Sequence, residues 1–127
     1  IAVGKLAYVE RRSKISVKDA IKAIHAAGGL VFISHPGVYE NFDIAKFIDY
    51  FLNNGGDGIE TYYAYETSHY HTGVRATKKI IGKFRKIAKE KGILETGGSD
   101  FHGRKDQVLG KLKVPYSVLG KLRKRIK

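Results

Sequence analysis

The segment Leu30-Val31-Phe32-Ile33-Ser34-His35-Pro36-Gly37 decides how this chain can fold. It opens with a short apolar run, rich in β-branched and aromatic residues, that glycine and proline bound on its two sides. Such a run is typical of a strand buried in a parallel sheet. The segment therefore predicts a strand over residues 30–34, with His35 presented at its carboxyl end by the turn that Pro36 fixes.

Helical and extended patterns alternate around this strand. Apolar residues recur at helical spacing in four stretches, and we expect helices over residues 17–27, 44–53, 74–91 and 117–126. Ser16 and Asp43 are the expected N-caps of the first two helices. Two further strands are expected over residues 58–63 and 93–96. This order predicts an α/β fold in which β/α units surround a parallel sheet.

The composition limits the chemistry that the chain can perform. Its 127 residues suit one domain or a part of one, and residues 1–127 are treated as a single unit. Because the chain has no cysteine, any metal must be held by His, Asp, Glu and water, a donor set that suits zinc, manganese or iron. The lack of cysteine also suits a reducing compartment, so we expect a cytoplasmic protein. No apolar run approaches the roughly 20 residues of a membrane helix, so no membrane partner is expected.

The chain carries a large excess of positive charge. It has 24 Lys and Arg against 12 Asp and Glu, a net charge of +12. Such an excess favours anionic partners and steers phosphorylated substrates toward the protein. The alternative is a lysine-rich surface that is merely well solvated, and charge alone gives the two readings equal weight.

Four residues with metal-binding side chains fall at the ends of the expected strands: His35, Glu60, Asp100 and His102. Reactive residues of α/β folds gather where parallel strands end, so these four would converge. Asp100 and His102 are two residues apart and could reach one ion or two adjacent ions. Each residue also has a plainer interpretation. Asp100 could cap a turn, either histidine could be an ordinary loop residue, and Glu60 could form a salt bridge instead of orienting a metal-bound histidine.

Four other residues are weaker candidates. His25 lies inside a predicted helix, where it is expected to pack or to support the site from behind rather than to bind a metal. His69 and His71 could point the same way, and we prefer a substrate-facing role for one of them, with Arg75 as an anion ligand. A zinc site and an exposed polar loop are the alternatives for this stretch. The sequence contains no Gly-rich phosphate loop, no Gly-x-Ser-x-Gly motif and no evident RNA-binding motif.

Four segments taken together resemble the PHP (polymerase and histidinol phosphatase) family. They are Ala20-Ile21-Lys22-Ala23-Ile24-His25-Ala26-Ala27-Gly28-Gly29, Ile33-Ser34-His35-Pro36-Gly37, Gly55-Gly56-Asp57-Gly58-Ile59-Glu60 and Thr96-Gly97-Gly98-Ser99-Asp100-Phe101-His102-Gly103. Their order and spacing match the family over residues 16–115. They look most like the small PHP phosphoesterases that include nucleoside 3',5'-bisphosphate phosphatases and 5'-to-3' exoribonucleases.

The resemblance implies a fold and a site. The fold would be part of a distorted (β/α)7, TIM-like barrel, with three β/α units and a C-terminal helix in this chain. His35, Asp100 and His102 would be ligands in a cluster of two or three divalent metals. The implied reaction is hydrolysis of a phosphomonoester of a nucleotide-like substrate by a metal-activated hydroxide. The partner would be a phosphorylated small molecule or an oligonucleotide.

One departure from the family pattern is large. Family members begin with a His-x-His strand and supply further ligands early, whereas the first histidine here is His25. We therefore expect the N-terminal half of the barrel to be missing from residues 1–127, so that the chain supplies part of a site and is inactive alone. The open barrel edge could then self-associate. The alternative is an inactive PHP-like module whose basic surface binds nucleic acid or a partner protein.

Overall fold

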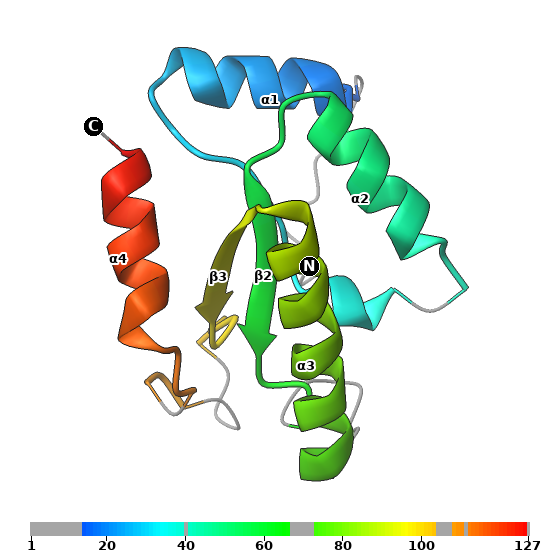
Figure 1. The fold of residues 1–127 in the computed structure, drawn as a ribbon, viewed down its shortest axis with the longest axis vertical. Helices are drawn as coiled ribbons and strands as arrows, with labels where there is room; N and C mark the ends of the chain where they lie inside the picture. The colour runs from blue at the N-terminus through cyan, green and yellow to red at the C-terminus, as the bar shows by residue number, and fades with distance from the viewer. Residues whose placement is uncertain (1–13, 40, 67–72, 104–107, 111, 127) are drawn as a thin grey trace, which may run out of the picture.

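The computed structural model describes residues 14–39, 41–66, 73–103, 108–110 and 112–126 (Figure 1). Its elements, in chain order, are α1 (Val17–Ala26), β1 (Phe32–Ile33), the 3-10 helix η1 (Pro36–Val38), α2 (Ile44–Asn53), β2 (Gly58–Tyr63), α3 (Gly73–Lys91), β3 (Leu94–Gly98) and α4 (Tyr116–Arg125). The predicted alternation of helices and strands is confirmed.

The three strands form one parallel sheet in the order β1-β2-β3. α3 packs along β2 and α4 along β3 (Figure 1). The architecture is thus α/β with a parallel sheet, as predicted, and it is consistent with part of a barrel. In the part of the chain that the structure describes, no helix combines the length and apolar character needed to cross a membrane.

Two apolar clusters hold these elements together. The larger one joins α1, α2 and α3 to the first two strands through Ile21, Ile33, Ile48, Phe51, Ile59, Phe84 and Ala88. The smaller one lies beneath η1 and consists of Val38, Tyr63 and Tyr65. Because the second cluster lies under the turn that carries His35, packing there holds the loop at the end of β1.

The two predicted N-caps are confirmed. The Ser16 hydroxyl accepts a hydrogen bond from the backbone N–H of Asp19 at 3.1 Å. The Asp43 carboxylate accepts one from the N–H of Lys46, also at 3.1 Å. Each bond satisfies an amide that the first helical turn leaves unpaired.

Two strand boundaries differ from the prediction. β1 is shorter than residues 30–34, because the N–H and C=O of Val31 are bonded to Asp57 and not to the strand ladder. β3 runs two residues further than predicted, because Gly97 and Gly98 pair with the end of β2. A Cβ at Gly97 would lie 2.5 Å from the Tyr62 Cβ, so only glycine allows this close pairing.

Candidate functional site

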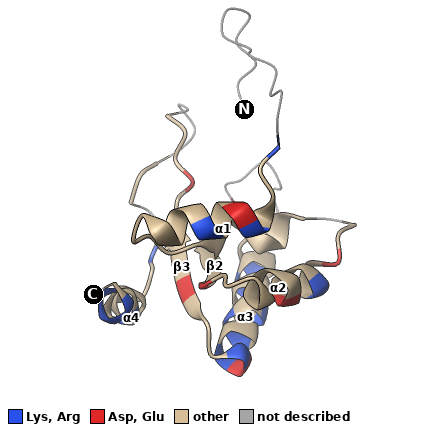
Figure 2. Cartoon of the chain, turned by 90° about the horizontal axis from the view of Figure 1, so that it is seen from above, with Lys and Arg blue, Asp and Glu red and all other residues tan. Residues whose placement is uncertain are grey.

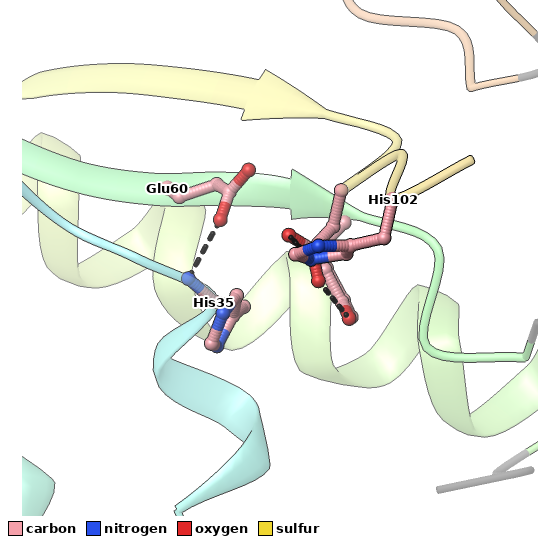
Figure 3. Close-up of polar contacts among 5 residues, drawn as sticks. His35, Glu60 and His102 are labelled. Atoms are coloured by element: carbon pink, nitrogen blue, oxygen red, sulfur yellow. Dashed lines mark hydrogen bonds and ion pairs between the residues drawn. The ribbon is translucent and has the colours of Figure 1, made fainter. Parts of the chain in front are cut away.

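The carboxyl ends of the three strands bring polar side chains together. His35 follows β1, Tyr63 ends β2, and Asp100 and His102 follow β3. Figure 3 shows His35 and His102 at the same end of the sheet, with Glu60 reaching toward the His35 turn. The structure therefore brings together the four residues that the sequence placed at strand ends.

His35 is held in an unusual backbone conformation. Its φ of +31° lies in the left-handed region, which histidine adopts more readily than most residues but still at a cost. Its N–H donates to the Glu60 carboxylate at 2.7 Å (Figure 3). Two residues later, the Gly37 N–H donates to the Tyr65 hydroxyl at 3.1 Å. These two bonds fix the turn, and with it the position of the imidazole.

The His35 imidazole is packed between aromatic rings. Its ring centroid lies 5.1 Å from that of Tyr63 and 6.0 Å from that of Tyr39. Within the described residues, no group hydrogen-bonds to its buried Nδ1 atom. A buried ring nitrogen without a hydrogen-bond partner is costly, and a neutral imidazole nitrogen in this state is suited to bind a metal ion.

Asp100 and His102 form a second pair at this end of the sheet. Asp100 also has a left-handed backbone, with φ +49°. Its Oδ1 lies 3.0 Å from His102 Nε2, and its Oδ2 accepts a hydrogen bond from the Tyr63 hydroxyl at 3.2 Å. The prediction that Asp100 and His102 point the same way agrees with this contact.

Glu60 occupies a different place from the one expected. It lies in the middle of β2, not at its end. A bulge in the β2–β3 pairing explains how it still reaches the site: Glu60 pairs with Thr96, Tyr62 pairs with Gly97, and the residue between them has no partner in β3. The extra residue changes the alternation of side chains, so that Glu60 and Tyr63, three apart, both contact His35.

Burial changes the acidity of two groups here. Removal from water raises the pKa of the Glu60 carboxyl above its usual range, and the nearby Asp100 charge adds to this, although the His35 N–H opposes it. Burial also raises the pKa of Tyr65 to about 12. The Tyr65 phenol is thus neutral at physiological pH and keeps its hydroxyl for the Gly37 turn.

His25 does not join this group. Its Nε2 lies 2.8 Å from Asp57 Oδ2, and the same oxygen accepts the Val31 N–H at 2.8 Å. Asp57 directly precedes β2, so the pair lies at the amino end of the sheet. His25 links α1 to that end of the sheet, away from His35. Of its two predicted roles, packing agrees with this position, and the structure does not bring His25 to the site.

Of the remaining candidates, Arg75 lies in the part of the chain that the structure describes. Arg75 is exposed in the first turn of α3, and this helix begins at the same end of the sheet as the site. His69 and His71 lie outside the described residues. Tyr63 and Tyr65 were missed by the sequence interpretation. The bulge that turns Tyr63 toward His35 has no signature in the sequence.

The donor types at the carboxyl end suit a divalent metal of borderline softness. His35 offers a buried Nδ1 atom, and Asp100 and His102 offer a carboxylate and an imidazole. Among the described residues, however, no group of three or more His, Asp or Glu side chains is arranged to hold an ion. These residues therefore form an incomplete ligand set.

Several solved structures are similar to the chain, among them the following two. One is an amidohydrolase from Chromobacterium violaceum with bound sulfate and no metal, at 29% identity and a TM-score of 0.68, and the match covers 94% of this chain and 40% of that one. The other is described as a candidate metal-dependent phosphoesterase from Bifidobacterium adolescentis, at 25% identity and a TM-score of 0.66, with 98% and 41% covered. No protein-family model and no curated protein matches the chain.

These matches bear on the predicted family. At 29% and 25% identity, the two neighbours show that this arrangement of helices and strands occurs in a solved amidohydrolase and in a candidate metal-dependent phosphoesterase. Metal dependence is part of the description of the second neighbour, and the first was solved with sulfate and no metal. The chain spans 40% and 41% of the lengths of the two neighbours.

Proposed function

We propose that the complete protein is a metal-dependent phosphoesterase that hydrolyses a phosphomonoester of a nucleotide-like substrate. The observation that carries the proposal is the convergence of His35, Asp100 and His102 at one end of a parallel sheet, with a buried imidazole nitrogen left without a partner. The finer placement in the PHP family, with a TIM-like barrel and two or three zinc, manganese or iron ions, belongs to the same proposal. Two neighbours support the phosphoesterase function: one is described as a candidate metal-dependent phosphoesterase, and the other binds sulfate, an anion that resembles phosphate.

In this proposal His35, Asp100 and His102 are metal ligands contributed by this chain. When bound, divalent ions would activate water and neutralise charge on the phosphoryl oxygens. Glu60 and Tyr63 are positioning residues: Glu60 fixes the His35 turn through the backbone, and Tyr63 donates to the Asp100 carboxylate. Arg75, with His69 or His71, would bind the substrate phosphate.

The test is metal content and phosphate release in the complete protein. We expect Asp100→Asn and His35→Gln to lose bound metal and hydrolysis of a nucleoside 3',5'-bisphosphate together. His25→Gln is the matched control, because this histidine lies at the other end of the sheet, and it should retain both properties. Full activity with normal metal content in Asp100→Asn would contradict the proposal.

A second candidate function rests on the incomplete ligand set of the described residues. The chain would then be an inactive PHP-like module that binds an anionic partner through its basic surface. A chelator separates the two candidates, because it should abolish hydrolysis by the phosphoesterase and leave the binding of the inactive module unchanged.

A further inference from the structure

A row of aromatic rings leads away from the candidate site. The Tyr39 ring lies 6.0 Å from that of His35, and the Phe42 ring lies 6.2 Å from that of Tyr39, measured between centroids. The row continues with Phe47, 5.5 Å from Phe42, and then with Tyr50, 6.4 Å from Phe47. These distances lie within the range of about 4.5–7 Å that favours contact between aromatic rings. Tyr39 is thus the member of the row that packs against a proposed metal ligand.

Much of this row is open to solvent. Tyr39, Phe42 and Tyr50 are exposed, and the half-buried Phe47 joins them into one continuous patch. Single exposed apolar side chains are common on protein surfaces, whereas a continuous apolar patch marks a site of interaction. Because the patch starts beside His35, it suits a ligand whose other end reaches the candidate site.

The chain holds the Tyr39 ring in a fixed place. Tyr39 directly follows η1, where the N–H of the buried Val38 donates to the His35 carbonyl at 3.1 Å. The ring contacts the His35 imidazole, and it also meets the Phe42 ring at an interplanar angle of 60°. A ring whose position is set before a ligand arrives loses little conformational freedom on binding, which favours affinity.

Tyr39 also forms part of the wall of a cavity with a volume of about 210 Å³. Besides aliphatic residues of α1 and β1, the cavity is lined by four aromatic residues, namely Phe32, Tyr39, Phe47 and Phe51. Among the described residues, the lining includes no acidic or basic residue, and Ser34, the residue before His35, also belongs to it. Pockets that enclose a whole drug-sized molecule measure about 300–1,000 Å³, so this cavity suits a flat fragment of a substrate.

The most positively charged helix of the described chain, α3, contributes no residue to the lining of this cavity. Figure 2 shows Lys and Arg along α3, and Arg75, the proposed phosphate ligand, belongs to the same helix. A phosphate group is therefore favoured near α3 and the proposed metal ligands. The cavity favours an uncharged group instead, because a charge buried without a partner is costly.

We infer that Tyr39 stacks on the base of the substrate and is thus a specificity-determining residue of the site. This inference rests on the proposed function, and it assigns to one side chain the distinction between nucleotides and other phosphomonoesters. A nucleobase has a flat π face that stacks on an aromatic ring, whichever base it is. A sugar phosphate has no such face, and an alkyl phosphate fills an apolar cavity without stacking, so these two serve as comparison ligands.

Steady-state hydrolysis of adenosine 3',5'-bisphosphate and of ribose 5-phosphate by the complete, metal-loaded protein tests the inference. Tyr39→Leu should raise KM for the nucleotide about tenfold with little change in kcat, because stacking stabilises the ground and transition states equally. KM for ribose 5-phosphate should stay the same. Tyr39→Phe keeps the ring and should restore tight binding of the nucleotide. The matched control is Tyr50→Leu, since Tyr50 is 49% exposed against 43% for Tyr39 but lies at the far end of the row, and it should leave KM unchanged.

A second readout does not depend on hydrolysis. Adenosine, which carries no phosphate, should show upfield shifts of its base protons in NMR titrations with the parent protein, and smaller shifts with Tyr39→Leu. If the parent protein hydrolyses neither phosphomonoester, the proposed function fails, and the adenosine titration alone decides the inference. Hydrolysis of both substrates with the same KM values in the parent protein and in Tyr39→Leu removes the inference alone.

Three further results would overturn the inference. One is a rise in KM that is equal for the nucleotide and for ribose 5-phosphate in Tyr39→Leu. Another is an equal rise in KM for the nucleotide in Tyr50→Leu. The third is binding of octyl phosphate that depends on Tyr39 as strongly as binding of the nucleotide does, because an alkyl chain does not stack.

Discussion

The two ends of the sheet each hold an aspartate paired with a histidine, and the two pairs differ in what surrounds them. At the amino end, the Asp57 side chain is 5% exposed and His25 38% exposed, with Nε2 and Oδ2 2.8 Å apart. At the carboxyl end, Asp100 is 35% exposed and His102 66% exposed, with Nε2 and Oδ1 3.0 Å apart. The contacts are nearly identical in length, so distance alone does not separate a structural pair from a functional one.

The surroundings of each carboxylate make the distinction. The oxygen of Asp57 that meets His25 also accepts the Val31 N–H, so this carboxylate joins the His25 side chain of α1 to the backbone that leads into β1. Asp100 has a left-handed backbone and accepts a hydrogen bond from the Tyr63 hydroxyl, and the ring of the same tyrosine packs against His35, whose Nδ1 is buried without a partner. The first arrangement stabilises the fold, whereas the second places a carboxylate and an imidazole at the same end of the sheet as the buried His35 Nδ1. The predictions below follow from this difference.

The largest expected effect is on activity at the carboxyl end. Asp100→Asn should reduce phosphate release by the complete protein about 100-fold or more, because it removes a proposed metal ligand. Its free energy of unfolding, measured by urea titration, should change little, since Asp100 is part of no core cluster. A large loss of stability with unchanged activity would show that Asp100, like Asp57, stabilises the fold, and would contradict the proposed difference between the two ends of the sheet.

The converse change tests the amino end. Asp57→Ala should lower the free energy of unfolding by about 1–3 kcal/mol, because it leaves the part-buried Val31 N–H without its acceptor. His25→Ala should cost less, about 1 kcal/mol or below, since this side chain is partly exposed. Urea titrations of both variants provide the measurement. If His25→Ala costs as much as Asp57→Ala, the backbone bond to Val31 is not the main contribution.

The glycine pair in β3 tests how tightly the carboxyl end is built. Gly97→Ala should destabilise the protein by about 1–3 kcal/mol, because the new Cβ would overlap Tyr62. Gly98→Ala is the matched control, since its Cβ would lie at an ordinary 3.5 Å from Glu60 Oε1. Thermal unfolding of both variants decides the matter, and equal stability of the two would contradict the close pairing.

Tyr65 gives a smaller effect with a defined pH dependence. Burial raises the folded-state pKa of this phenol to about 12, above its unfolded value of about 10. The neutral form is therefore favoured in the folded state, and its contribution is complete below pH of about 10 and is lost as the pH rises toward about 12. Tyr65→Phe should lose about 1 kcal/mol at neutral pH, because the Gly37 N–H loses its acceptor. Its stability should then fall less steeply at alkaline pH than that of the parent protein, and an equally steep fall would exclude Tyr65 as the cause.

The sequence predicted much of this molecule, because local patterns determined it. Ser16 and Asp43 cap helices for reasons that lie within one turn, and the apolar run at Phe32 and Ile33 indicates a buried strand wherever it occurs. The convergence of His35 with Asp100 followed from one assumption, that the strands are parallel neighbours, and the sheet order confirms it.

The parts that could not be predicted depend on pairing between distant segments. The bulge that directs both Glu60 and Tyr63 to His35 arises from the register of β2 against β3. The attachment of His25 to Asp57 likewise depends on how α1 docks on the sheet, which helical spacing does not specify. The bulge changes which side chains of β2 face the site, and the His25–Asp57 contact joins residues that are far apart in the chain. Neither feature leaves a local pattern in the sequence.

The most direct test of the central claim is the location of bound metal in crystals of the complete protein grown with manganese, by anomalous scattering. The proposal predicts anomalous density at the carboxyl end of the sheet, beside His35, Asp100 and His102, and none beside His25 and Asp57. Manganese absent from the carboxyl end, or bound instead at the amino end, would contradict it.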